Sequence, residues 1–303
     1  MFDADYVKQT ELMLRCLPAV AKQPCFALKG GGAINFFHKD MPRLSVDVDL
    51  TYCRFNDRNV SLSEIDAALK DISAGLKKSL DNVIVRPRVV EGYAIRLVVG
   101  FGDTQIKIEP NLVLRGSVQK PEELELCDAA QKRFNMSVSL PCLSGADLYG
   151  GKLCAALDRQ HPRDLFDVKL LMDDTGITQE IRRAFVVYLA GHNRPMSELL
   201  APKPQDMSEI YPNEFQGMTR VDIALAELQA VQKTLASTLV GLLDANERGF
   251  LISMKRGEPE WERLGIDNLE RFPALQWKLL NIRRMGSKKR LAALKRLEEI
   301  LDV

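Results

Sequence analysis

Two aspartates alternate with apolar residues in the segment Ser45-Val46-Asp47-Val48-Asp49-Leu50. Side chains in a β-strand point alternately to its two faces, so Asp47 and Asp49 share one face and the apolar residues bury the other. Two neighbouring anions repel each other, and a divalent cation that prefers carboxylate oxygens, such as Mg²⁺, relieves the repulsion. The pattern therefore favours a metal site, although a solvated strand edge also has this pattern.

A later strand carries a third carboxylate. In Ile106-Lys107-Ile108-Glu109 the isoleucines share one face, and Glu109 lies with Lys107 on the other. If the two strands are neighbours, Glu109 completes a cluster of three carboxylates with Asp47 and Asp49. Such a cluster can hold two Mg²⁺ ions, one that activates an attacking hydroxyl group and one that binds a triphosphate and its leaving group.

A glycine turn precedes the two aspartates. Gly30 and Gly31 follow an apolar strand at residues 26–29, and the apolar run 33–37 predicts a short helix after them. Glycines let backbone N–H groups approach a phosphate, and the positive end of a following helix points to the same place. The turn therefore predicts a phosphate site close to the carboxylates.

The second half of the chain holds a basic helix face followed by two more aspartates. Lys152 and Arg159 are seven residues apart, which places them two turns apart on nearly the same face, where they suit a triphosphate. Asp164 and Asp167 follow in the first turn of the next helix, where negative charge is favourable. Their residue types leave open a structural role for one of them, as an anchor for Lys152 or Arg163.

Taken together, these motifs resemble the nucleotidyltransferase superfamily that includes DNA polymerase β, which combines a glycine turn, an acidic strand pair and a third acidic residue. The stretch LYGGKLCAALDRQHPRDLFDV at 148–168 and the motif Arg43-x-Ser45-x-Asp47-x-Asp49-Leu50 resemble, more narrowly, the AbiEii/AbiGii toxin family of bacterial nucleotidyltransferases. The likeness spans roughly residues 25–170.

This resemblance implies a Mg²⁺-dependent enzyme that transfers an NMP unit from an NTP to an acceptor hydroxyl and releases pyrophosphate, as the toxin of a toxin–antitoxin pair used in phage defence. It implies that Asp47, Asp49 and Glu109 hold the metal ions, with Lys152 as a further catalytic residue. The nucleotide-binding residues that it implies are Lys29, Gly30, Gly31, Ser45, Lys152, Arg159, Asp164 and Asp167. The implied partners are an NTP, an RNA acceptor such as the 3′ end of tRNA, whose modification would halt translation, and a cognate antitoxin.

Two positions depart from the family pattern. Gly32 stands where the family commonly has a small hydroxyl residue, so backbone amides must bind the phosphate there, and Glu109 stands where aspartate is more usual. Neither departure removes a metal ligand. Three alternatives stay open: transfer to a small molecule, transfer to a protein, and a protein that binds an NTP without transferring it.

The elements that must position these residues follow from periodicity. We expect a helix at 5–21 and another that Ser61 and Glu64 begin as a capping box. Strands are predicted at 46–52, 83–90, 93–101 and 105–113, with the last two joined in an antiparallel hairpin. Ser144 caps a helix that runs to about Gln160, Pro162 opens the next one, and later helices centre on 185, 232, 279 and 295, with loops at 195–212 and 255–259.

These elements predict an α+β fold with two domains. A polymerase β-like nucleotidyltransferase domain with a mixed sheet occupies residues 1–140, and a helical domain with the Lys, Arg and Asp motifs occupies residues 141–303. The length of 303 residues agrees, because a typical domain has about 150 residues, and an apolar content of 46% excludes a disordered chain.

The net charge of +1, from 42 Lys and Arg against 41 Asp and Glu, excludes a surface that is basic throughout, but not a local basic patch. The run from Arg283 to Arg296 holds seven basic residues and no acidic one. It is either a solvated helix face or a patch that follows the phosphates of an RNA acceptor. We expect Trp261, Trp277 and Phe272 to be packing residues.

Charged residues interrupt the first 25 positions, and no apolar run approaches the ~20 residues of a membrane span, so we expect a cytoplasmic protein without a signal peptide or a membrane partner. The six cysteines form no C-x-x-C pair and the chain has three histidines, which argues against a zinc site or a disulfide framework.

Overall fold

The computed structural model describes residues 2–303, and the chain forms two compact units. The first unit runs through Leu148 and also includes Phe215–Asp222, and the second comprises Tyr149–Glu214 and Ile223–Val303. The return of residues 215–222 to the first unit has no signal in the sequence. This segment pairs with the chain just before the Asp47 motif, because the backbone N–H of Leu44 donates to Met218 O at 2.7 Å and Arg43 bridges to Thr219.

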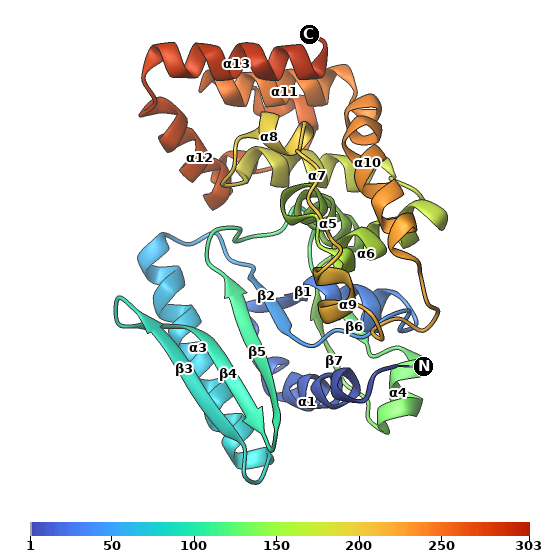
Figure 1. Cartoon of the computed structure of the whole chain (residues 1–303). Coiled ribbons are helices and arrows are strands. Elements are labelled where there is room, and N and C mark those ends of the chain that lie inside the picture. Colours follow the sequence, from blue (N-terminus) through green and yellow to red (C-terminus); the bar gives the residue numbers. More distant parts are fainter. Residues whose placement is uncertain (1) are drawn as a thin grey trace. The chain divides into compact units, whose positions relative to one another are not determined.

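A seven-stranded mixed sheet with the order β3-β4-β5-β2-β1-β7-β6 forms the first unit (Figure 1). The central strand β2 is antiparallel to β1 and parallel to β5. The predicted hairpin of β4 and β5 is confirmed, with Phe101 opposite Thr104. The strands are β1 (Phe26–Lys29), β2 (Val48–Tyr52), β3 (Ile84–Val90), β4 (Tyr93–Phe101), β5 (Thr104–Asn111), β6 (Glu122–Glu125) and β7 (Ser139–Cys142), of which β6 and β7 were not predicted.

Two long helices, α1 (Ala4–Val20) and α3 (Arg58–Ser79), contact each other and pack against β5 and β4 respectively. The apolar stripe of α3 is buried as its periodicity predicts, with Ile65, Leu69 and Leu76 fully inaccessible. Each such leucine contributes about 1.5–3 kcal/mol of burial free energy. The shorter helices of this unit are α2 (Gly30–Ala33), the π-helix η1 (Ile34–His38) and α4 (Asp128–Phe134).

The predicted capping box of α3 is wrong. The helix begins at Arg58 after Asp57, so Ser61 lies inside it and donates its hydroxyl to Asn56 O at 3.1 Å. Glu64 does not reach back to the helix start, because its carboxylate accepts the Tyr52 hydroxyl at 2.7 Å.

The second unit is helical, as predicted. Ser144 accepts the N–H of Asp147 at 3.2 Å at the start of α5, and Pro162 is at the first position of α6, so both predicted helix starts are confirmed. Two predictions need correction: α11 was missed, and the expected loop at 195–212 contains α8 and the start of α9. The helices are α5 (Gly145–Arg159), α6 (Pro162–Asp173), α7 (Gln179–Gly191), α8 (Met196–Leu200), α9 (Ile210–Glu214), α10 (Leu225–Leu242), α11 (Ala245–Arg256), α12 (Pro273–Arg283) and α13 (Ser287–Leu301), with 3₁₀ turns η2 (Trp261–Leu264) and η3 (Leu269–Arg271).

The core of this unit is built around α7, which is buried from Ala184 to Gly191. Helix α5 crosses α7 at Gly150, where a Cβ atom would lie 2.7 Å from the backbone nitrogen of Phe185. The first glycine of the Tyr149-Gly150-Gly151-Lys152 motif therefore allows two helix backbones to approach closely and thereby fixes the position of α5.

Among residues 2–303, no helix combines the length and the apolar composition that crossing a bilayer requires.

Candidate active site

Three predicted site residues lie in one row across adjacent strands. Lys29, the last residue of β1, is opposite Asp49 in β2, and Asp49 is opposite Glu109 in β5. Residues directly opposite one another on adjacent strands point to the same face of the sheet. The predicted adjacency of the Asp49 and Glu109 strands is therefore confirmed.

The glycine turn lies directly against this row. Gly30 has a φ of +70°, which favours glycine, and a Cβ atom on it would lie 2.6 Å from Oδ2 of Asp49. Gly30 is therefore required twice, once for the left-handed backbone and once for the space that the Asp49 carboxylate occupies. The helical segment of α2 and η1 begins at the same glycine, so its first N–H groups lie next to the row.

Gly31 is enclosed by a cation and a hydroxyl group. A Cβ atom on Gly31 would lie 2.6 Å from Nη2 of Arg43 and 3.1 Å from Oγ of Ser45. Arg43 is almost fully buried and donates to Leu44 O at 2.7 Å. Ser45, a predicted nucleotide-binding residue, thus lines the glycine turn together with a buried positive charge.

The turn is held by a residue that the sequence analysis missed. Nδ2 of the buried Asn35 donates to Gly31 O at 2.9 Å. Arg43 was quoted only as part of the motif and received no role. The spacing of four residues between Gly31 and Asn35, one helical turn, is the signal that could have identified Asn35.

The remaining carboxylates each bind a protein group. Asp47 precedes β2, which starts two residues later than predicted, and its Oδ1 accepts the N–H of Lys107 at 2.9 Å. Its side chain therefore takes a place that a backbone carbonyl would hold in a longer strand. Oε1 of Glu109 lies 2.5 Å from Nη2 of Arg96 in β4, an ion pair that the sequence analysis did not predict.

Within residues 2–303, no three Asp, Glu, His or Cys side chains gather closely enough to hold a metal ion. The donor set still fits Mg²⁺ chemically, because it consists of carboxylate oxygens and because Asp49 and Glu109 are strand neighbours. Metal binding by Asp47, Asp49 and Glu109 stays a prediction, and it requires Glu109 to share or release Arg96.

The four charged residues predicted in the second unit form one cluster, in which Lys152, Asp164 and Asp167 are buried. Nζ of Lys152 lies 2.8 Å from Asp164 Oδ1 and 3.0 Å from Asp167 Oδ2. Arg159 donates through Nε to Asp164 Oδ2 at 2.6 Å. Both aspartates contact Lys152, as expected of a structural anchor, whereas Arg163 pairs with Glu214 at 3.1 Å. Their part in nucleotide binding stays a prediction.

Charge balance explains why Lys152 and the two aspartates can be buried together. Burial alone would raise the pKa of Asp164, but Lys152 and Arg159 outweigh it and hold that pKa well below its usual value. Lys152 is only 6% exposed, whereas the side chain of Arg159 is 63% exposed. The predicted contact of Lys152 with a triphosphate stays a prediction, and Arg159 is the cation of this cluster that faces solvent.

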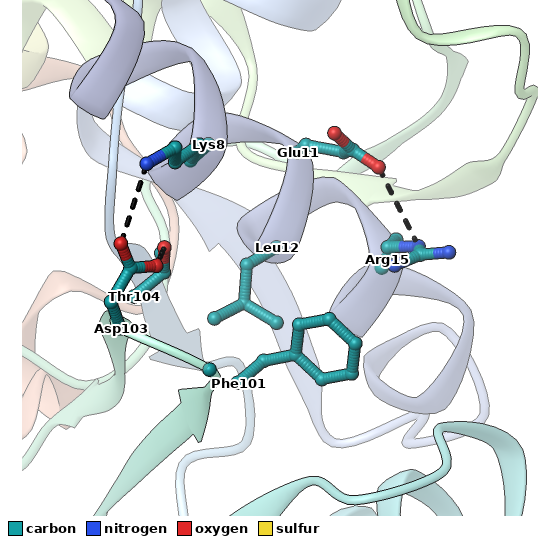
Figure 2. A pocket seen from close by; sticks show the side chains of 8 residues that line it. Lys8, Glu11, Leu12, Arg15, Phe101, Asp103 and Thr104 are labelled. Carbon is teal, nitrogen blue, oxygen red and sulfur yellow. Dashed lines mark hydrogen bonds and ion pairs between the residues drawn. The ribbon is translucent and has the colours of Figure 1, made fainter.

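A separate hollow of about 230 Å³ lies in the first unit between α1 and the turn that joins β4 to β5 (Figure 2). Its charged groups pair with one another, Lys8 with Asp103 at 3.3 Å and Glu11 with Arg15 at 3.9 Å. No predicted site residue lines it. Nothing in this hollow therefore places the reaction there.

Comparisons with known proteins identify the family and the fold. The family model "Nucleotidyl transferase AbiEii toxin, Type IV TA system" matches residues 11–279. A search of curated protein sequences finds no match. Among solved structures, MenT4, a nucleotidyltransferase toxin from Mycobacterium tuberculosis H37Rv, is similar, with a TM-score of 0.59, 17% identity, and coverage of 98% of this chain and 95% of that chain. At this identity the likeness shows the fold.

Proposed function

Because this chain belongs to the AbiEii family of nucleotidyltransferase toxins of type IV toxin–antitoxin systems, we propose that it transfers an NMP unit from an NTP to the 3′ end of tRNA. Membership of the family implies an NTP substrate and an antitoxin partner. A tRNA with a modified 3′ end cannot accept its amino acid, so translation and growth stop. We place this reaction in the cytoplasm, where tRNA and NTPs are found.

The row of Lys29, Asp49 and Glu109, with Gly30 pressed against the Asp49 carboxylate, carries this proposal. The row combines a phosphate-binding turn with carboxylates on the neighbouring strands, which phosphoryl transfer requires at one place. A solvated strand edge needs no glycine at position 30.

In the proposed reaction, the oxygen of the acceptor hydroxyl attacks the α-phosphorus of the NTP. The bond from the α-phosphorus to the oxygen that bridges it to the β-phosphorus breaks, and pyrophosphate leaves with that electron pair. Glu109 accepts the proton of the hydroxyl group. Mg²⁺, when held by Asp47, Asp49 and Glu109, supplies positive charge to the phosphate oxygens.

The triphosphate is assigned to the glycine turn and its neighbours. The N–H groups of Gly30 and Gly31 and the hydroxyl of Ser45 would bind its oxygens, and Lys29 would add positive charge. From the second unit, Lys152 and Arg159 are proposed to stabilise the phosphates, with Asp164 fixing both side chains and Asp167 fixing Lys152.

The test incubates the pure protein with Mg²⁺, each labelled NTP in turn, and total tRNA, and follows label on the RNA. We expect labelled tRNA with wild type, and a loss of at least about 100-fold with Asp49→Asn, which keeps the shape but removes the charge. The matched control is Asp81→Asn, because Asp81 is exposed in the turn after α3.

The location of the label decides between acceptors. Label on the protein, on the antitoxin or on a small molecule, with none on RNA, overturns the tRNA proposal. Expression in cells gives a second test: wild type and Asp81→Asn should stop growth and Asp49→Asn should not. Equal inhibition by all three would rule out toxicity through catalysis.

A further inference from the structure

A run of basic side chains extends from the end of α12 to the tenth residue of α13 in the second unit. We name it the α12–α13 basic surface: Arg283, Arg284, Lys288, Lys289, Arg290, Lys295 and Arg296. Arg283 donates to Gly257 O at 3.5 Å. The other six form no ion pair with any carboxylate in the described part of the chain, residues 2–303, so their charge is not locally compensated.

The start of α13 increases this positive charge. Lys288 and Lys289 lie in its first turn, which contains no acidic residue. The N-terminal end of a helix carries a partial positive charge, so cations there destabilise the helix and concentrate positive potential. This arrangement opposes helix stability, and a bound anion would remove the conflict.

A lysine on a neighbouring helix adds to this positive charge. Lys255 in the last turn of α11 is 6% exposed and has no hydrogen bond or ion pair among residues 2–303. Helix α11 packs against α13 (Figure 1), and burial together with the charge of Lys289 lowers the pKa of Lys255. Nζ of Lys255 is not among the buried side-chain nitrogens that lack a hydrogen-bond partner, so it reaches solvent and adds its positive charge to this part of the unit.

A second buried lysine belongs to the same group of charges. Lys278 of α12 donates to His192 O at 2.6 Å and to Arg194 O at 2.8 Å. Burial, followed by the charge of Lys255, lowers its pKa to about 8, and Glu198 acts weakly in the opposite direction. Three helices therefore bring lysines close enough to repel each other.

An exposed aromatic ring lies beside these charges. Phe272 is buried and Trp261 packs 6.1 Å from Phe250 between ring centroids, as expected, but the expected packing of Trp277 is wrong, since it is 51% exposed. The buried stripe of α12 passes through Leu275, Lys278, Leu279 and Ile282. Trp277 lies on the opposite face with Leu280 and Arg284, at helical spacings of three and seven residues.

We propose that the α12–α13 basic surface, with Lys255 and Trp277, binds the backbone and one base of the RNA acceptor. This inference rests on the proposed function, since it locates the RNA that the enzyme modifies. Unpaired cations suit a chain of phosphates, and an exposed tryptophan on the same helix face as an arginine suits a stacked base. A protein partner would require carboxylates to meet seven cations, whereas every nucleotide of an RNA supplies an anion.

The test measures binding of fluorescein-labelled total tRNA to the full-length protein without NTP, over a series of salt concentrations. Lys288→Glu/Lys289→Glu should weaken binding at least about tenfold and reduce the slope of log affinity against log salt by about 2. Acidic residues in the first turn of α13 favour the helix, so this variant retains its fold, which circular dichroism checks.

The matched control is Lys77→Glu/Lys78→Glu, an exposed lysine pair in the last turn of α3 with the same change of charge. It should bind tRNA within about twofold of wild type, with an unchanged salt slope. Trp277→Ala should weaken binding about tenfold without changing the salt slope, because stacking involves no counterion release.

The outcomes separate this inference from the proposed function. If wild type labels no RNA but binds tRNA through these residues, the proposed function fails and the surface assignment stands. If wild type labels tRNA and the α13 variant binds as tightly as its control, the surface assignment is overturned. Unchanged RNA binding together with loss of neutralisation by the antitoxin would also overturn it, because the surface would then bind protein.

Discussion

The backbone of Gly30 and the carboxylate of Asp49 are in such close contact that a Cβ atom on Gly30 would lie 2.6 Å from Asp49 Oδ2. This contact joins the glycine turn to the proposed metal site. A change confined to one methyl group on the turn must therefore move the carboxylate.

Gly30→Ala should lower kcat/KM by about 100-fold, because a displacement of about 1 Å in a reacting constellation has an effect of that size. It should also reduce the free energy of unfolding by about 1–2 kcal/mol, since alanine is strained at a φ of +70°. Steady-state kinetics and urea unfolding measure the two effects.

The control for this prediction is Gly176→Ala. Gly176 has a φ of +69°, and a Cβ atom on it would meet nothing within 4 Å, so this variant carries the same backbone strain without touching the site. A similar loss of activity in both variants would show that backbone strain, and not the contact with Asp49, is responsible.

The ion pair between Arg96 and Glu109 predicts how the enzyme responds to Mg²⁺. The guanidinium occupies Glu109 Oε1 at 2.5 Å, so it competes with a metal ion for the same carboxylate. Arg96→Gln should therefore lower the Mg²⁺ concentration that gives half-maximal activity, and Glu109→Gln should raise it. We expect each change to be about tenfold, which corresponds to about 1.4 kcal/mol in the free energy of Mg²⁺ binding. Calorimetric titration with Mg²⁺ measures the affinity directly. If Arg96→Gln also raises the Mg²⁺ concentration needed for half-maximal activity, Arg96 positions Glu109 and does not compete with the metal ion for it.

The buried cluster of Lys152 predicts a large effect on stability. Lys152→Met leaves Asp167 buried without its cation, so the free energy of unfolding should fall by about 3 kcal/mol. Lys169→Met removes the lysine of an i,i+4 pair on α6 whose aspartate is 58% exposed, and it should change the free energy of unfolding by about 0.5 kcal/mol or less. Both tryptophans lie in the second unit, so tryptophan fluorescence in urea reports on this unit alone.

A double variant separates the structural role of Lys152 from its proposed role in transfer. Lys152→Met/Asp167→Asn removes the unpaired charge and should recover part of the lost stability. If Lys152 also contacts the triphosphate, activity should stay low in this stabilised variant. Recovery of activity together with stability would limit Lys152 to anchoring the two aspartates.

Local patterns made part of this site predictable. The period of two in the Asp47–Asp49 segment and in the Ile106–Glu109 segment indicated strands with carboxylates on one face, and the burial of Ile106 and Ile108 agrees. The glycine turn was recognisable because a left-handed φ restricts the residue type at position 30.

The partners of these groups could not be predicted, because strand register and helix packing are not local properties. Arg96 meets Glu109 only because β4 and β5 pair in one register. Residues 215–222 return to the first unit across more than sixty intervening residues. Trp277 is a large aromatic residue of the kind that is usually buried. The buried apolar stripe of α12, however, lies on the opposite face of this helix.

The three histidines predict how stability depends on pH. Burial lowers the pKa of His38, His161 and His192, so each is held neutral in the folded chain. The unfolded chain binds protons with a histidine pKa near 6.5, above the folded values, so the free energy of unfolding should fall as pH drops below about 6.5.

His161 offers a test, because its Nδ1 accepts the N–H of Arg163 at 3.1 Å and caps α6. His161→Asn keeps a capping side chain and removes the titrating group, so between pH 7.5 and pH 5 this variant should lose less stability than wild type in urea unfolding followed by tryptophan fluorescence. An identical decline in the two proteins would assign the pH dependence of the second unit to His192 and the carboxylates, and not to the cap of α6.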